Sequence, residues 1–266
     1  MTTYAIGDVR GNYQALEQLL DQIGFDETQD TLWFTGNLIG GGGDSLAVLQ
    51  FVKGLGTRAV SVLGDEELRL LAVAQGVQVP GAVTAFDDIL AAPDSDALLK
   101  WLRQCPFLHH EHGYTLVHAG IPAEWSLSQV RTLAMEAETS LSMGGHQAFL
   151  ENIFGDGPPP PRWHAKHRGW NRVRFIVNAL TRMRYYNDKG RLHFSSDSID
   201  DMETQGLIPW YLMADRAMAN QKIIFGHGSM PDSGVVPGIY ALGGGEAEGS
   251  LNALKIPTQQ RKVALT

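Results

Sequence analysis

The stretch Leu32-Trp33-Phe34-Thr35-Gly36-Asn37-Leu38 is typical of a short buried strand that runs into a glycine-containing loop. Four other apolar runs in the chain end in the same way, with a polar residue beside glycine. They lead into Gly7-Asp8, Gly64-Asp65, His118-Ala119-Gly120 and Gly226-His227. In an α/β sheet, ligands bind at the carboxyl ends of the strands. We therefore expect these polar side chains to converge on a metal or phosphate site.

Strand and helix patterns alternate over the first 72 residues. They predict strands at 4–6, 32–35 and 59–63, followed in turn by helices at 12–23, 44–54 and 65–75. A second sheet is predicted from strands at 107–110, 114–117, 222–225 and 238–242. Residues from about 126 to 185 are predicted to be mainly helical. The fold class is therefore α/β.

The loop series Gly-Asp-x-x-Gly, Gly-Asn, Gly-Asp-Glu-Glu, His-Ala-Gly and Gly-His resembles that of the calcineurin-like metallophosphoesterases. Segments 30–36, 172–184 and 238–242 narrow the resemblance to the bacterial symmetrical diadenosine tetraphosphatases, the ApaH family. The resemblance covers the whole chain. It implies a two-sheet sandwich flanked by helices, as a single domain over 1–266, with a helical cap inserted at about 126–185. It also implies a two-metal site that cuts diadenosine tetraphosphate into two ADP.

The chain keeps only part of this family's metal-site pattern. Asp8, His118 and His227 match it. By resemblance, Arg10 stands where the family has a metal-binding histidine, and Asn37 stands where it has a bridging aspartate. A carboxylate can share its charge between two cations, whereas an amide offers one neutral oxygen.

Three further positions also differ. By resemblance, Asp65 replaces an asparagine ligand, and Glu66 replaces the histidine proposed as general acid. The run Gly40 to Gly43 occupies the place of a phosphate-binding arginine. The remnant catalytic positions are Asp8, Asn37 and Glu66.

These changes predict that the first metal site is absent. Arginine stays protonated and donates hydrogen bonds only, so Arg10 cannot ligate a metal, and we expect it to pair with Asp8. One divalent metal, manganese, iron or zinc, remains possible at a second site. Its ligands would be Asp65, His118, His227 and the amide oxygen of Asn37. In the alternative without a metal, Arg10 bridges Asp8 and Asp65, and both histidines are hydrogen-bonded core residues.

Two other groups of charged residues admit two interpretations each. Glu66 and Glu67 are either a catalytic acid/base pair or, as we favour, the first turn of a helix, where acids meet the helix dipole favourably. The basic segment 168–184 either binds phosphate or forms surface ion pairs. The candidate substrate-binding residues are Arg10, Arg172, Arg174, Asn178, Arg182 and Arg184.

Composition excludes several classes of function. The chain has 266 residues and a formal charge of −8, so general binding to nucleic acid is not expected. A single cysteine, Cys105, allows no internal disulfide, as is typical of a reducing cytoplasm. The start shows no secretory signal, and no apolar run is long enough to span a bilayer. We expect a cytoplasmic protein without a membrane partner.

These observations lead to three functional hypotheses. The first is a protein with a degenerate metal site that binds dinucleoside polyphosphates or related nucleotides with little or no hydrolysis. The second is an active symmetrical diadenosine tetraphosphate hydrolase that works with a reduced metal site. The third is an interaction scaffold that binds no nucleotide. The sequence does not say which protein, if any, would be its partner.

Overall fold

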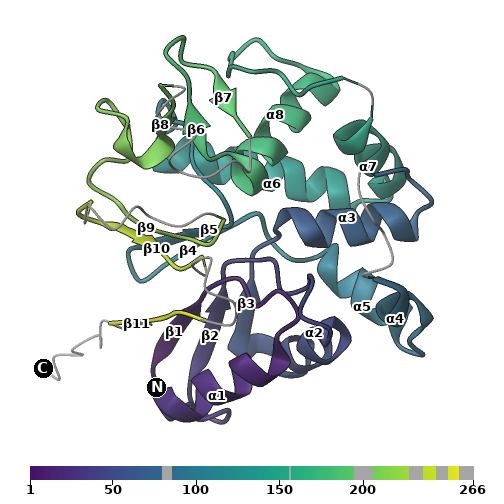
Figure 1. The fold of residues 1–266 in the computed structure, drawn as a ribbon. Coiled ribbons are helices and arrows are strands. Elements are labelled where there is room, and N and C mark those ends of the chain that lie inside the picture. The colour runs from purple at the N-terminus through teal and green to yellow at the C-terminus, as the bar shows by residue number, and fades with distance from the viewer. Residues whose placement is uncertain (80–85, 156, 195–205, 228–235, 244–250, 258–266) are drawn as a thin grey trace, which may run out of the picture.

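The computed structural model describes residues 1–79, 86–155, 157–194, 206–227, 236–243 and 251–257 (Figure 1). Two four-stranded sheets form its centre, with strand orders β11-β1-β2-β3 and β10-β9-β5-β4. The first sheet contains β1 (Thr3–Ile6), β2 (Thr31–Phe34), β3 (Ala59–Ser61) and β11 (Ala253–Ile256). The second contains β4 (Leu108–Glu111), β5 (Tyr114–Val117), β9 (Lys222–Phe225) and β10 (Ile239–Ala241).

Helices cover the outer faces of these sheets, as Figure 1 shows. Those of the first half of the chain are α1 (Tyr13–Ile23), α2 (Ser45–Gly54), η1 (Gly56–Arg58), α3 (Asp65–Ala74), α4 (Asp87–Ala91) and α5 (Ser95–Leu102). Those of the second half are α6 (Leu127–Ser142), α7 (His146–Phe154), α8 (Gly169–Arg182) and η3 (Trp210–Leu212). A small third sheet beside α8 consists of β6 (Tyr185–Tyr186), β7 (Leu192–His193) and β8 (Ile208–Pro209).

Alternation along the strands builds two layers of core. Ala5, Trp33, Leu116 and Ile224 point into a cluster between the two sheets. The next residues along the same strands belong to the larger cluster beneath the helices. These residues are Ile6, Phe34, Val117 and Phe225. Successive side chains of a strand face opposite sides of its sheet, so each strand contributes to both layers. The result is a sandwich with helices on both outer faces.

Parallel pairing brings the strand ends to the same edge of each sheet. In the first sheet β1 pairs in parallel with β2, and β2 with β3. In the second, β5 pairs in parallel with β9. The loops that follow β1, β2, β3, β5 and β9 carry the polar residues of the candidate site.

The two-sheet α/β fold predicted from the sequence is confirmed. The helices over 13–23, 45–54 and 65–74 lie within a residue of the predicted ranges, and α1 ends at Gly24, which has a left-handed conformation (φ 64°). Strand β11, which extends the first sheet by pairing antiparallel with β1, was not predicted. The segment predicted as a helical cap contains α6, α7 and α8, and its role as a cap inserted in a single domain stays a proposal.

Candidate metal centre and phosphate cleft

Three of the predicted ligands come together at the edge where the two sheets meet. Asp65 begins α3, and His118 and His227 lie just beyond β5 and β9. Each offers one ligand atom, and these atoms all lie within 4.8 Å of one another. The Asp65 Oδ1 atom is 3.3 Å from His118 Nε2 and 3.8 Å from His227 Nδ1. Among the described residues this is the one such group of three.

The histidine nitrogens that face Asp65 are free to act as ligands. His118 Nδ1 lies 2.7 Å from the carbonyl oxygen of Thr35, which can only accept, so Nδ1 carries the proton. His118 Nε2 and His227 Nδ1 are buried and make no hydrogen bond among the described residues. Because buried polar atoms are normally paired, this arrangement fits a metal ion. Two imidazoles and a carboxylate suit zinc, iron or manganese.

The charges of the site also suit a cation. Burial alone would raise the pKa of Asp65, but the close contact with His118 and the nearby His227 keep it well below its ordinary value. Burial opposes the charging of His118, yet Asp8, Asp65 and Glu67 outweigh it and raise its pKa to about 9. Burial and the neighbouring His118 hold the pKa of His227 well below its ordinary value. A proton and a metal ion therefore compete for the lone pair of His118 Nε2.

Asn37 orients Asp65. Its amide nitrogen donates to Asp65 Oδ1 at 3.1 Å, and its amide oxygen accepts from the Glu66 N–H at 3.1 Å. An N–H must meet the oxygen, and a carboxylate must meet the NH₂ group, so these two bonds fix the orientation of the amide. The oxygen that we expected to face the metal is turned toward the start of α3. A role for Asn37 as a ligand stays a proposal.

Asp8 is paired with Arg10. The Asp8 side chain is fully buried, and its Oδ1 accepts a hydrogen bond from the Thr35 hydroxyl at 2.9 Å. Its Oδ2 makes no hydrogen bond among the described residues, and Arg10 Nη2 lies 3.7 Å away. Burial raises the pKa of Asp8, and the charges of His118 and Arg10 work against that rise. Within the described part of the chain Arg10 forms no ion pair with Asp65, so the predicted bridge between Asp8 and Asp65 is not observed.

Glu67 holds the loops of the site together, a role that the sequence did not reveal. Its side chain is buried at 1% exposure. Its carboxylate accepts from the N–H groups of Asn37 (2.9 Å), Leu38 (2.8 Å) and Gly64 (2.8 Å). The carboxylate thereby ties the loop after β2 to the loop after β3. A glutamate three residues beyond a helix N-cap is the signal that could have predicted this bond.

Glu66 and Glu67 lie in the first turn of α3, which confirms the interpretation of this motif as a helix start. Glu66 pairs with Arg69 at 3.6 Å. Burial and the neighbouring Asp65 raise the pKa of Glu66.

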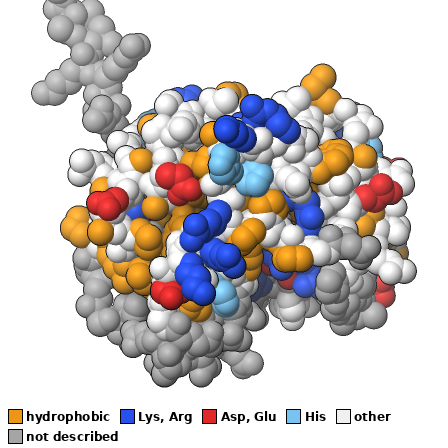
Figure 2. Space-filling model, turned by 90° about the horizontal axis from the view of Figure 1, so that it is seen from above, with side chains coloured by type: hydrophobic (Ala, Val, Ile, Leu, Met, Phe, Trp, Pro, Cys, Tyr) orange, Lys and Arg blue, Asp and Glu red, His pale blue; other side chains and the backbone are white. Residues whose placement is uncertain are grey.

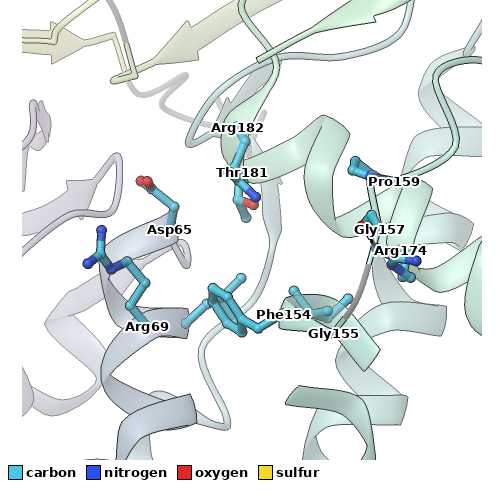
Figure 3. Close-up of a pocket in the computed structure, with 11 residues that line it drawn as sticks. Asp65, Arg69, Phe154, Gly155, Gly157, Pro159, Arg174, Thr181 and Arg182 are labelled. Carbon is cyan, nitrogen blue, oxygen red and sulfur yellow. Dashed lines mark hydrogen bonds between the residues drawn. The ribbon is translucent and has the colours of Figure 1, made fainter. Parts of the chain in front are cut away.

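A cavity of about 290 Å³ opens beside the metal group. Figure 3 shows Asp65 and Arg69 on one side of it and Thr181 and Arg182 of α8 on the other. Arg174 also lines the cavity, and Phe154, Ile153, Leu68 and Pro159 supply apolar surface. The cavity thus combines guanidinium groups with an apolar wall, which suits a ligand that carries both phosphate and an apolar ring.

Only some of the predicted substrate-binding residues line this cavity. Arg182 lines the cavity and donates to the buried Asn178 at 3.2 Å, and Arg174 donates to the Gly157 carbonyl at 2.6 Å. Arg172 is engaged elsewhere: its Nε lies 2.8 and 2.9 Å from the two carboxylate oxygens of Glu136. Its guanidinium also lies over the Trp163 ring at 4.9 Å. Arg184 lines a separate small hollow that it shares with His227.

Basic side chains gather on one face of this acidic protein. Figure 2 shows Lys, Arg and His side chains together on the face seen from above. The segment before α8 contributes exposed basic residues to the surface, at Arg162, Lys166 and Arg168.

Comparisons with known proteins show the family of the chain. The calcineurin-like phosphoesterase family matches residues 1–227. The symmetrical bis(5′-nucleosyl)-tetraphosphatase of Methylococcus capsulatus is 45% identical over 86% of this chain and 82% of its own length. The protein of the same description from Nitrosococcus oceani is 40% identical over 98% of this chain and 95% of its own length. The chain belongs to the calcineurin-like phosphoesterases and, within them, to the family of symmetrical bis(5′-nucleosyl)-tetraphosphatases.

A solved structure supports the fold alone. The crystal structure of a candidate diadenosine tetraphosphatase superposes with a TM-score of 0.57 at 19% identity, over 96% of this chain and 93% of that one. Membership in the family implies divalent metals, and the group of Asp65, His118 and His227 is where the described residues could hold one. None of the described helices has the length and apolarity needed to cross a bilayer.

Proposed function

We propose that this chain binds a dinucleoside tetraphosphate in the arginine-lined cavity and hydrolyses it symmetrically with a single metal ion. One observation carries the proposal: Asp65 belongs both to the candidate metal group and to the wall of that cavity. A phosphate that enters the cavity would therefore meet the metal and the guanidinium groups together. The relatives that match nearly the whole chain carry the corresponding name.

The residues take distinct roles in this proposal. Asp65, His118 and His227 would hold the ion, which supplies Lewis acidity and an activated water. Arg182 and Arg174 neutralise phosphate oxygens from α8. Water attacks one of the two central phosphorus atoms, and the bond from that phosphorus to the oxygen that joins the two central phosphates breaks. One nucleoside diphosphate keeps the oxygen of the water, the other leaves with the former bridging oxygen, and the proton released from the water passes to solvent.

The second candidate function is binding of the same ligand without turnover. It is favoured by the pairing of Arg10 with Asp8 and by the engagement of the Asn37 oxygen, both at positions where the family resemblance implies metal ligands. Stabilisation of developing negative charge usually contributes more to catalysis than any other single effect. We therefore expect the rate to lie well below that of a two-metal phosphatase.

Chromatography of diadenosine tetraphosphate incubated with the purified protein separates the two functions. We expect ADP as the sole nucleotide product with added manganese, and no ADP with a chelator or in the Asp65→Ala variant, which removes the ligand atom. No turnover together with a nucleotide-dependent rise in melting temperature would select binding alone. No turnover and no thermal shift would contradict both and favour the scaffold.

A further inference from the structure

The buried Asp8 carboxylate lies close to two basic side chains, Arg10 at its Oδ2 atom and His118 Nδ1 at 3.9 Å from its Oδ1 atom. Asp8 is 0% exposed, and its Oδ2 makes no hydrogen bond among the described residues. Unpaired charges are rarely buried, because removing an ion from water costs several kcal/mol. The nearest guanidinium atom, Arg10 Nη2, lies 3.7 Å from this oxygen. The Arg10 side chain is 56% exposed, so it also reaches solvent.

The surroundings of Asp8 do not fit a second metal ion. A two-metal phosphatase site holds two ions between bridging oxygen ligands. Here the neighbouring Asn37 amide donates to Asp65, and its neutral oxygen already accepts from the Glu66 N–H, so it does not offer the shared charge of a bridging carboxylate. In the part of the chain that the structure describes, Asp8 belongs to no group of three side chains that could ligate a metal. An arginine cannot complete such a group.

The backbone fixes Arg10 in this place. Arg10 has a left-handed conformation (φ 52°), and its N–H donates to the Asn37 carbonyl at 2.8 Å. Its own carbonyl accepts from the Gly42 N–H at 2.8 Å. A Cβ at Gly42 would lie 2.6 Å from the Gly11 carbonyl carbon, so glycine permits this close approach of the two loops. The guanidinium therefore starts from a rigid turn rather than a free loop.

We propose that Arg10 takes the place of a second metal ion. Its guanidinium balances Asp8 on one side and binds a phosphate group of the ligand on the other. The centre then holds one divalent ion and one fixed organic cation. The phosphate-binding half rests on the proposed function, whereas the metal count stands on its own.

Manganese binding to the metal-free protein tests the inference, by equilibrium dialysis with metal analysis. We expect one equivalent for the parent and two for the double variant Arg10→His/Asn37→Asp, which restores ligand-type side chains at both positions. Two equivalents in the parent, or one in the folded double variant, would overturn the proposal. The parent count needs no variant and stands even where a variant does not fold.

Calorimetric titration with ADP in the presence of manganese tests the phosphate contact. Arg10→Gln should keep one manganese and weaken ADP binding by about tenfold or more, since charge-assisted hydrogen bonds contribute strongly. Arg168→Gln is the matched control, because Arg168 is exposed and donates to nearby carbonyls at Ala165 and His167. Equal ADP affinity in Arg10→Gln and the parent would contradict the contact. A single manganese without turnover would refute hydrolysis and leave the metal count intact.

Discussion

At the scale of single residues, Glu67 organises the site although it is not itself a candidate ligand. Its two carboxylate oxygens accept three backbone N–H groups from two loops. Glu67→Gln would present an NH₂ group to at least one of these donors and leave it unsatisfied. We expect a loss of about 1–3 kcal/mol in the free energy of unfolding, measured by urea denaturation. We also expect weaker manganese binding, because the loops of Asn37 and Asp65 would lose their link.

Glu66→Gln is the control for this prediction. Glu66 occupies the same turn of α3, but its ion pair is with the partly exposed Arg69 at 3.6 Å. Such a pair contributes about 0–1 kcal/mol. If the two variants lose the same stability, the three-bond link is not what holds these loops.

At the scale of one element, the arginines of α8 have different surroundings, and we expect them to have different roles. Arg182 faces the cavity, whereas Arg172 pairs with Glu136 and lies over Trp163. Arg182→Gln should weaken ADP binding by about tenfold, measured by calorimetry. Arg172→Gln should leave ADP affinity within about twofold and cost about 1 kcal/mol of stability. The reverse pattern would place the ligand on the outer face of α8.

The loop before α2 allows a second comparison within one element. A Cβ at Gly42 would meet the backbone of the Arg10 turn, whereas a Cβ at Gly41 would meet nothing within 4 Å. Gly42→Ala should therefore destabilise the protein by about 1–3 kcal/mol, as overpacking does. Gly41→Ala should change stability by about 0.5 kcal/mol or less. Thermal unfolding of both variants checks this, and equal melting temperatures would show that the two loops do not depend on close approach.

At the scale of the whole molecule, the sequence predicted the arrangement of the sheets better than the details of the site. Strand ends beside glycine were sufficient to predict that Asp65, His118 and His227 converge, because parallel strands end at one edge. The orientation of the Asn37 amide depends on partners 28 and 29 residues away along the chain. The partner of Arg172 lies 36 residues away on α6. Such pairings are set by packing between elements, which local sequence patterns do not record.

Strand β11 shows the same limit. It spans only Ala253–Ile256 and pairs with β1 at the other end of the chain. Four residues carry too little periodicity to predict a strand. Its pairing covers the edge of the first sheet that β1 would otherwise leave open.

The most direct test of the account follows ADP release from diadenosine tetraphosphate while manganese is added stepwise to metal-free protein. The protein concentration is held well above the dissociation constant of the metal, so that the rate reports the number of ions required. We predict that the rate rises linearly and stops rising at one equivalent of manganese. A rate that stops rising only at two equivalents, or no ADP at any ratio, would contradict a single-metal symmetrical hydrolase.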